Sequence, residues 1–313
     1  MPRIVAVLLA LLLAAPASAY DPANRDQLWY SNAVFGRINP LGLIDRFRLG
    51  YRRRLEVSDN VLGRDAFFFV GLALDASPAF GRIGVHVEAE PVALFRMGVT
   101  YQFTGYFGSF DQIASFPTAD ADYSDSALER RGEAGLTAPT YGHVLNVFAQ
   151  PKFKIGPIAM RDTITVVWQQ LALPAGDTAW YDQVNDRLSP NGDGVLLLND
   201  ADVLGVVGHA VFGARYTYTA SFFPSGSTGD GVVPHHRLGP LFAYTFHNHR
   251  DRARWDRPTL FALVQWWLQH PYRTGQDVHQ GLPLMALGLA FEGDLLWKGP
   301  PAGRARRGKH GGG

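Results

Sequence analysis

Strict alternation between apolar and polar residues runs through this sequence in unusually long segments. In residues 93–107 (ALFRMGVTYQFTGYF), Phe95, Val99 and Phe103 occupy odd positions, whereas Arg96 and Thr100 occupy even ones. Alternation with a period of two indicates a β-strand whose two faces meet different surroundings. Strands of water-soluble proteins usually have about five or six residues, but a tilted strand that crosses a bilayer needs about 9–11. The pattern therefore predicts strands that span a membrane.

Segments of this kind recur along the chain and predict an all-β fold of about twelve antiparallel strands. The eighth is the weakest, because residues 199–212 can also be read as a short helix that begins at Asn199 or Asp200. Lipid offers no partner to an open sheet edge, so we predict a transmembrane up-and-down β-barrel within residues 20–298. The expected strands are residues 28–36, 43–57, 65–76, 79–90, 93–108, 141–155, 158–171, 194–207, 209–223, 236–247, 258–270 and 282–297.

The connections between these segments predict how the barrel is oriented. Bacterial outer-membrane barrels have long outer loops and short periplasmic turns. With both chain ends in the periplasm, the long connections all fall on the outer side: residues 109–140, 172–193, 224–235 and 271–281. The first two outer connections are short, and two periplasmic turns are of medium length, so these depart from the rule.

The two ends of the chain are expected to lie outside the barrel. Residues 1–19 contain a basic Arg3, an apolar run at 4–15 and a small-x-small site at 17–19, which predict a cleavable signal peptide. The apolar run is too short to cross a bilayer as a helix. Residues 299–313 are basic and rich in Gly and Pro, and we expect them to be disordered.

Composition excludes several functional classes. The chain has no Cys, so disulfides, thiol chemistry and thiolate zinc sites are ruled out. It has 29 Lys and Arg against 28 Asp and Glu, and removal of the signal peptide with Arg3 leaves 28 of each. Such a balanced chain is not basic enough to bind nucleic acid.

Taken together, these features resemble the Gram-negative outer-membrane β-barrel superfamily and its porin-like members. The resemblance is one of architecture: a signal peptide, long alternating strands, aromatic residues near strand ends and a last strand that ends at Trp297. It implies location in the cell outer membrane, with membrane lipids and the barrel-assembly machinery as partners. No motif points to one family, so the resemblance assigns no site residues. The aromatic residues expected at the membrane interfaces are Trp29, Tyr101, Phe103, Trp168, Phe222, Trp266 and Trp297.

The stretch RFRLGYRRRLEV, residues 46–57, shows what the two faces of a barrel strand would carry. Its even positions hold four arginines, which would line the lumen, and its odd positions are mainly apolar. Arg53 is the exception, because its odd position faces lipid. An arginine there costs about 2–4 kcal/mol at the midplane but about 0–1 near an interface, so Arg53 should lie near the periplasmic headgroups. The full set expected in the lumen is Arg46, Arg48, Arg52, Arg54, Arg82, His86, Glu88, Glu90, Arg96, Gln102, Lys152, Lys154, Arg161 and Arg215.

Two interpretations of these lumen charges stay open. They can form the selectivity surface of a water-filled pore, or they can pair with one another and fill the barrel. Arg52 and Arg54 are expected to contact Glu88 and Glu90, which lie two strands away, about 9–10 Å across the sheet. The acidic connection at residues 109–140 can likewise fold into the channel or stand outside it.

Three other sets of polar residues give weaker evidence for a functional site. His86 and Glu88 have the spacing of a His–carboxylate dyad on one strand face, but no Ser accompanies them, so an enzyme is the less favoured hypothesis. His235 and His236 should lie at the opposite end of a strand from His247 and His249, so we predict no metal site among them. Residues 186–195 (DRLSPNGDGV) only partly match a calcium loop, because the closing Glu is missing.

The sequence therefore predicts a barrel for passive, porin-like transport of small solutes or ions, without a cofactor. A hydrolase of lipid or peptide at the barrel rim is one alternative. A structural or receptor barrel with a filled lumen is another. The transported solute and the oligomeric state do not follow from the sequence.

Overall fold

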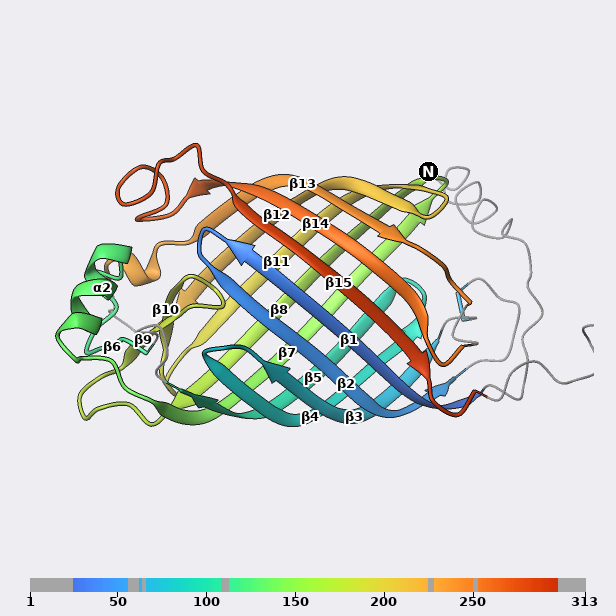
Figure 1. The fold of residues 1–313 in the computed structure, drawn as a ribbon, viewed down its shortest axis with the longest axis horizontal. Helices are drawn as coiled ribbons and strands as arrows, with labels where there is room; N and C mark the ends of the chain where they lie inside the picture. Colours follow the sequence, from blue (N-terminus) through green and yellow to red (C-terminus); the bar gives the residue numbers. More distant parts are fainter. Residues whose placement is uncertain are drawn as a thin grey trace, which may run out of the picture.

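The computed structural model describes residues 25–55, 62–63, 66–107, 113–224, 228–249 and 253–297. The predicted signal peptide at residues 1–19 and the tail at 299–313 lie outside the described residues. Within them, twelve antiparallel strands form one closed barrel (Figure 1), so the predicted architecture and strand number are confirmed.

The barrel strands follow one another around the wall in chain order, and the first pairs with the last. Residues 195–207, within the weakest predicted segment, form a strand rather than a helix. The barrel strands are β1 (Asp26–Ile38), β2 (Gly42–Arg54), β3 (Phe67–Ala76), β4 (Phe80–Val92), β5 (Phe95–Tyr106), β7 (Thr140–Ile155), β8 (Ile158–Leu171), β11 (Val195–Val207), β12 (Ala210–Phe222), β13 (His235–Thr245), β14 (Asp256–Gln269) and β15 (Leu284–Asp294).

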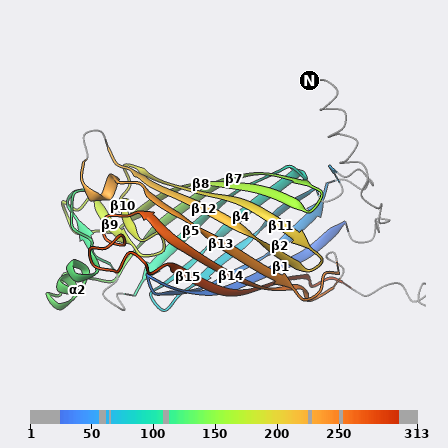
Figure 2. The same cartoon turned by 90° about the horizontal axis from the view of Figure 1, so that it is seen from above.

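The two ends of the barrel differ. One end, here called the terminal end, carries the start of β1 and the end of β15; the other, the loop end, carries the long connections (Figures 1 and 2). At the loop end these connections build a small cap. It contains the sheet β10–β9–β6 (Arg187–Pro190, Ala179–Asp182 and Ser115–Phe116), the helix α2 (Asp125–Glu133) and the short 3₁₀ helix η3 (Asp230–Val232).

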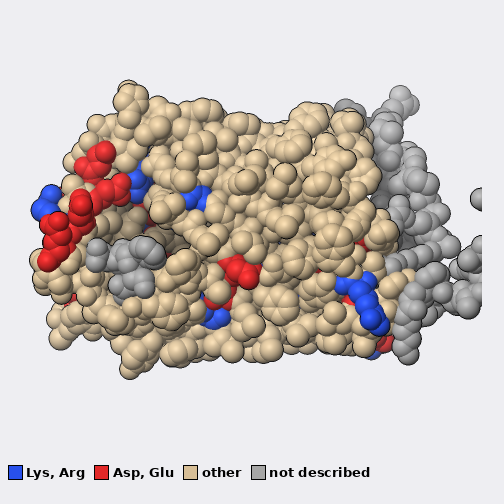
Figure 3. Space-filling model, viewed as in Figure 1, with Lys and Arg blue, Asp and Glu red and all other residues tan. Residues whose placement is uncertain are grey.

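The outer surface of the barrel is apolar around its middle. Leu72, Ile83, Val203 and Leu287 are among the many large apolar side chains that the wall exposes. On the face in Figure 3, charged side chains gather mainly towards the two ends, with one small acidic group between them. A closed sheet with this apolar belt has the surface of a membrane-spanning barrel. Among the described helices, none is long and apolar enough to cross a membrane.

The strand β2 shows the predicted division of its two faces. Arg46 and Arg48 line a cavity inside the barrel, whereas Tyr51 on the opposite face is exposed. Arg53 lies on the outer face one residue from the end of β2 and forms an exposed ion pair with Asp26, the first residue of β1, with Nε–Oδ1 at 3.8 Å. It therefore occupies the margin of the apolar belt, at the terminal end, where the sequence places it.

One predicted interface aromatic lies inside instead. The Trp29 ring packs edge-on against buried Phe69 at 5.3 Å and lies under the Arg52 guanidinium at 5.4 Å. Both faces of β1 mix apolar and polar residues, so alternation does not reveal which face points outwards. The other six are placed as follows: Tyr101, Phe103, Phe222 and Trp266 are exposed, while Trp168 and Trp297 are partly buried.

Candidate functional site

A cavity of about 960 Å³ occupies the lumen. It begins at the loop end, beside the short turns near Leu41 and Pro78, and extends to Glu88 and Arg96. Its volume is at the upper end of the range of small-molecule sites, about 300–1,000 Å³. The lumen is thus not completely filled with side chains.

One side of the cavity is formed by β1 to β4 and carries four arginines and two carboxylates, Asp75 and Glu88, of which Glu88 pairs with Arg96 of β5. We call Arg37, Arg46, Arg48 and Arg82, together with Asp75, the arginine wall. Arg48 Nη1 lies 2.7 Å from Asp75 Oδ1. Arg82 donates to the Tyr106 hydroxyl at 2.8 Å, and Arg37 donates to the backbone carbonyls of Gln183 and Val184 in the cap.

A second polar cluster lies on β4, β5 and β7, towards the terminal end. Glu88 Oε2 lies 2.6 Å from Arg96 Nη2 and 3.2 Å from His86 Nε2, and His86 Nδ1 lies 2.7 Å from the Thr100 hydroxyl. Thr100 and Glu88 face the cavity. This set unites the predicted His86–Glu88 pair with a hydroxyl from the neighbouring strand.

Towards the terminal end, beyond the residues that line the cavity, the inner wall carries buried side chains, among them Phe67, Phe69 and Glu90. Glu90 pairs with Lys152 at 2.7 Å, and the Arg52 guanidinium lies over the Phe67 ring at 4.1 Å. We call Glu90, Lys152, Phe67 and Arg52, with the adjoining Trp29–Phe69 pair, the constriction. Arg52 and Glu88 thus lie in one lumen as expected, although the ion pairs found for Glu88 and Glu90 are with Arg96 and Lys152.

A third cluster lies on the opposite side, on β8, β11 and β12. Asp202 is buried between Arg161, at 2.5 Å, and Arg215, at 2.7 Å, and Arg215 also reaches Asp200 at 3.2 Å. The two predicted lumen arginines therefore have carboxylate partners. Of the remaining predicted lumen residues, Gln102 lies on the cavity wall, Arg54 is half-buried at the end of β2, and Lys154 is exposed near the terminal end of β7.

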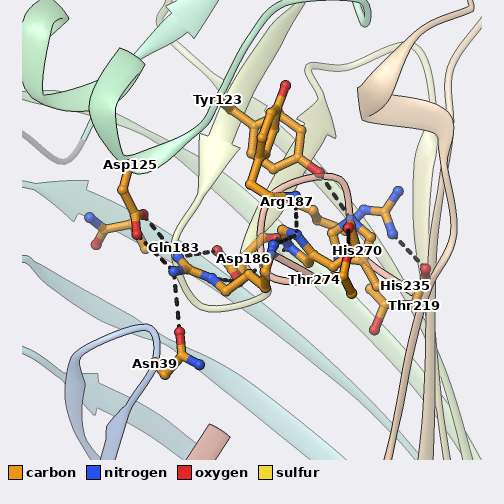
Figure 4. A network of polar contacts seen from close by, with 12 residues as sticks. Asn39, Tyr123, Asp125, Gln183, Asp186, Arg187, Thr219, His235, His270 and Thr274 are labelled. Atoms are coloured by element: carbon orange, nitrogen blue, oxygen red, sulfur yellow. Dashed lines mark hydrogen bonds and ion pairs between the residues drawn. The ribbon is translucent and has the colours of Figure 1, made fainter. Parts of the chain in front are cut away.

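The cap closes part of the loop end through a buried ion pair (Figure 4). Arg273 holds Asp186 with two donors, Nε at 2.7 Å and Nη2 at 3.1 Å. The same guanidinium donates to Asp125 at the start of α2 and to Asn39 in the turn between β1 and β2. His270 adds an ion-pair contact to Asp186 at 3.3 Å. We call this group the latch, because Arg273 joins four separate loops.

The structure also bears on two sequence predictions, the partial calcium loop at residues 186–195 and the two histidine pairs. Asp186, in the segment that partly matches a calcium loop, forms an ion pair with Arg273. Asn191 of the same segment is hydrogen-bonded to both backbone groups of Leu171. The segment is therefore a structural part of the cap. His235 begins β13 at the loop end, whereas His247 follows that strand, so the two predicted histidine pairs lie at opposite ends of the barrel.

The latch predicts a dependence of cap stability on acid pH. Burial alone would raise the pKa of the Asp186 carboxyl, but the His270 hydrogen bond and the Arg273 charge outweigh it and hold this pKa well below its ordinary value. An unfolded-state Asp has a pKa of about 3.9, so the contribution of Asp186 is complete above this pH and is lost as the pH falls further. Amide exchange in residues 179–190 measures the stability of the cap in wild type and in Asp186→Asn. We expect the difference between the two proteins to be constant near neutral pH and to shrink below about pH 4. A difference that grows in acid would contradict this assignment.

Sequence reasoning missed several residues of the site. Arg37 lies one residue beyond the expected end of the first strand, and Asp75 is the only charge facing inwards on a strand that is apolar on both faces. Asp186 and Arg273 are 87 residues apart in loops. Arg37 and Asp75 could have been found by extending the strand parity, but no sequence signal joins the two halves of the latch.

The comparisons with known proteins assign this chain to no family. No protein-family model matches the chain, and no curated protein matches its sequence. Similar solved structures include CdiB from Acinetobacter baumannii, with 8% identity and a TM-score of 0.38 over 86% of this chain and 60% of that one. The translocator domain of the autotransporter NalP from Neisseria meningitidis has 10% identity and a TM-score of 0.37, covering 93% and 95%. The outer-membrane protein OmpT of Vibrio cholerae, with loop L8 deleted, has 7% identity and a TM-score of 0.31, covering 85% and 98%. The chain thus spans about 60% of the CdiB structure. The barrel is established by this chain's own strand pairing.

Proposed function

We propose that this protein is an outer-membrane barrel that passes small solutes or ions through its lumen. The observation that carries the proposal is the cavity of about 960 Å³ inside a barrel whose outer surface is apolar. Of the 30 residues that line the cavity, 18 have charged, amide or hydroxyl side chains, which suit a hydrated path. A barrel that served only as a membrane anchor would have no need of such an interior.

Two features make the path narrow. The cap covers part of the loop end, and the constriction lies between the cavity and the terminal end. Solutes would enter beside the short turns near Leu41 and Pro78, where the cavity reaches the loop end. We therefore propose a channel with small conductance that excludes large molecules.

Conductance of the full-length protein in planar lipid bilayers tests the proposal. We expect small, discrete current steps, and larger steps when Phe67→Ala removes one ring of the constriction. Exposed Phe212, on the outer face of β12, offers a matched control, since Phe212→Ala should leave the step size unchanged. Heat-modifiable migration on a gel shows whether the protein is folded. If folded wild type and folded Phe67→Ala both give no current, transport is refuted.

A second candidate function rests on the Thr100–His86–Glu88 set. A hydroxyl, an imidazole and a carboxylate joined in this order have the arrangement of an activated nucleophile, and the hydroxyl faces the cavity. We propose ester or amide hydrolysis as the alternative activity. Hydrolysis of chromogenic esters that is lost in Thr100→Val would support it, whereas equal rates in the two proteins would exclude Thr100 as the nucleophile.

A further inference from the structure

The arginine wall carries more positive charge than its neighbours neutralise. It contains four arginines and one aspartate, which leaves an excess of three positive charges (4 − 1) on one side of the cavity. Asp75 lies directly between Arg46 and Arg82 in the strand register, but its carboxylate is held by Arg48. Like charges gathered inside a protein repel one another more strongly than they do in bulk water.

The other two charged clusters of the lumen are balanced. Arg96 and Lys152 have Glu88 and Glu90 as partners, and Arg161 and Arg215 share Asp202 and Asp200. These two clusters therefore do not offset the excess on the arginine wall.

Donor groups on this wall remain available to a ligand. Among the described residues, none accepts a hydrogen bond from Arg46, whose guanidinium lies over the Phe35 ring at 5.2 Å. The Arg82 guanidinium lies over Phe80 at 4.4 Å and donates from Nη2 to Tyr106, while its Nη1 has no acceptor among the described residues. Stacking on aromatic rings fixes the plane of each guanidinium, so that the donors are already oriented for a carboxylate or a phosphate.

The far side of the cavity carries neutral polar side chains beside the paired Asp200. Gln102, Asn146, Gln150, Thr163 and Thr165 supply amides and hydroxyls there. These groups can exchange hydrogen bonds with the neutral hydroxyls of a solute whose charged end meets the arginines.

We propose that the arginine wall is a binding site for small hydroxylated organic anions, with Arg46 and Arg82 as the direct contacts of the anionic group. This inference rests on the proposed transport function, for which it names the solute class. The shared chemistry is an oxyanion, supplied by either a carboxylate or a phosphate.

Calorimetric titration of the full-length barrel in detergent tests binding separately from transport. Gluconate and glucose 6-phosphate are the carboxylate and phosphate probes, and glucose is the neutral control. We expect both anions to bind and glucose not to bind. Arg46→Gln and Arg82→Gln should each weaken anion binding about tenfold or more, because a charge-assisted hydrogen bond is lost. Arg53→Gln removes the same charge from the outer face and should change nothing.

A second measurement, the reversal potential across a bilayer in a KCl gradient, follows ion preference. We expect wild type to prefer chloride and both glutamine variants to shift towards potassium, whereas Arg46→Lys, which keeps the charge, should shift less. Equal binding of glucose and gluconate, or wild-type affinity in both glutamine variants, would overturn the anion site. Anion binding without any current would refute transport but support the anion site. Current without ion preference would support transport but contradict the anion site. If one glutamine variant fails the gel test for folding, the other glutamine variant and Arg46→Lys still test the anion site.

Discussion

Replacing Arg273 by alanine should release the cap from the barrel. Arg273 is almost fully buried and is the shared partner of Asp186, Asp125 and Asn39. Its loss would leave the buried Asp186 carboxylate with only His270 and Tyr181 as side-chain partners. Removal of one member of a buried ion pair costs about 3–5 kcal/mol.

Limited proteolysis and amide exchange measure this release. In Arg273→Ala we expect rapid exchange in residues 179–190 and cleavage within the cap, while the barrel strands stay protected. Asp125→Asn is the matched control: the Asp125 side chain is 52% exposed, and an exposed ion pair is worth about 0–1 kcal/mol. Equal protection of the cap in wild type and Arg273→Ala would show that the latch does not hold it.

Replacing Trp180 by alanine should have an effect of similar size through a different contact. Trp180 lies on β9 and is fully buried, and its ring meets Tyr106 of β5 at 5.5 Å. It belongs to an apolar cluster that joins the cap to the inner side of the barrel at Ile44 and Phe80. Truncation of such a side chain costs about 3–5 kcal/mol, since apolar contacts are lost and a cavity remains.

The consequences of Trp180→Ala should appear at the loop end. We expect the cap to exchange amide protons faster. Under the proposed transport function we also expect larger currents, because the cap, which covers part of the loop end, loses its apolar contact with Ile44 and Phe80. Trp255→Ala is the control, since this ring is 53% exposed near the terminal end. A current identical to wild type would mean that the cap does not limit access to the lumen.

The barrel was predictable from the sequence because lipid and water impose a period of two on every spanning strand. β4 and β5 alternate cleanly, and their predicted faces agree with the structure, as Val85 and Tyr101 are exposed while Gln102 is buried. β1 could not be interpreted in this way, because Trp29 and Phe35 point inwards and Asn32 lies on the outer face with Asp45 as its partner. Where both faces of a strand contain apolar and polar residues, alternation does not show which face points outwards.

The cap and the arginine wall required the three-dimensional structure. Arg46 and Arg48 were assigned to the lumen by parity, but their imbalance with Asp75 depends on which strands are neighbours and on which residue Arg48 contacts. The latch depends on contacts between loops, where side chains follow no period. The acidic connection at 109–140 illustrates this, because its Ser115–Phe116 segment pairs with β9 in the cap while α2 stays on its surface.

Closure of the barrel has a consequence for how the chain assembles. Every barrel strand pairs with the next one in chain order, except at the seam where β1 meets β15. Register partners there, such as Trp29 and Asp294, are separated by nearly the whole described chain, so the entropy lost in bringing them together is the largest of any pairing. Until the seam forms, β1 and β15 are open edges that can pair with another chain. The seam is therefore the step at which assembly and misassembly compete.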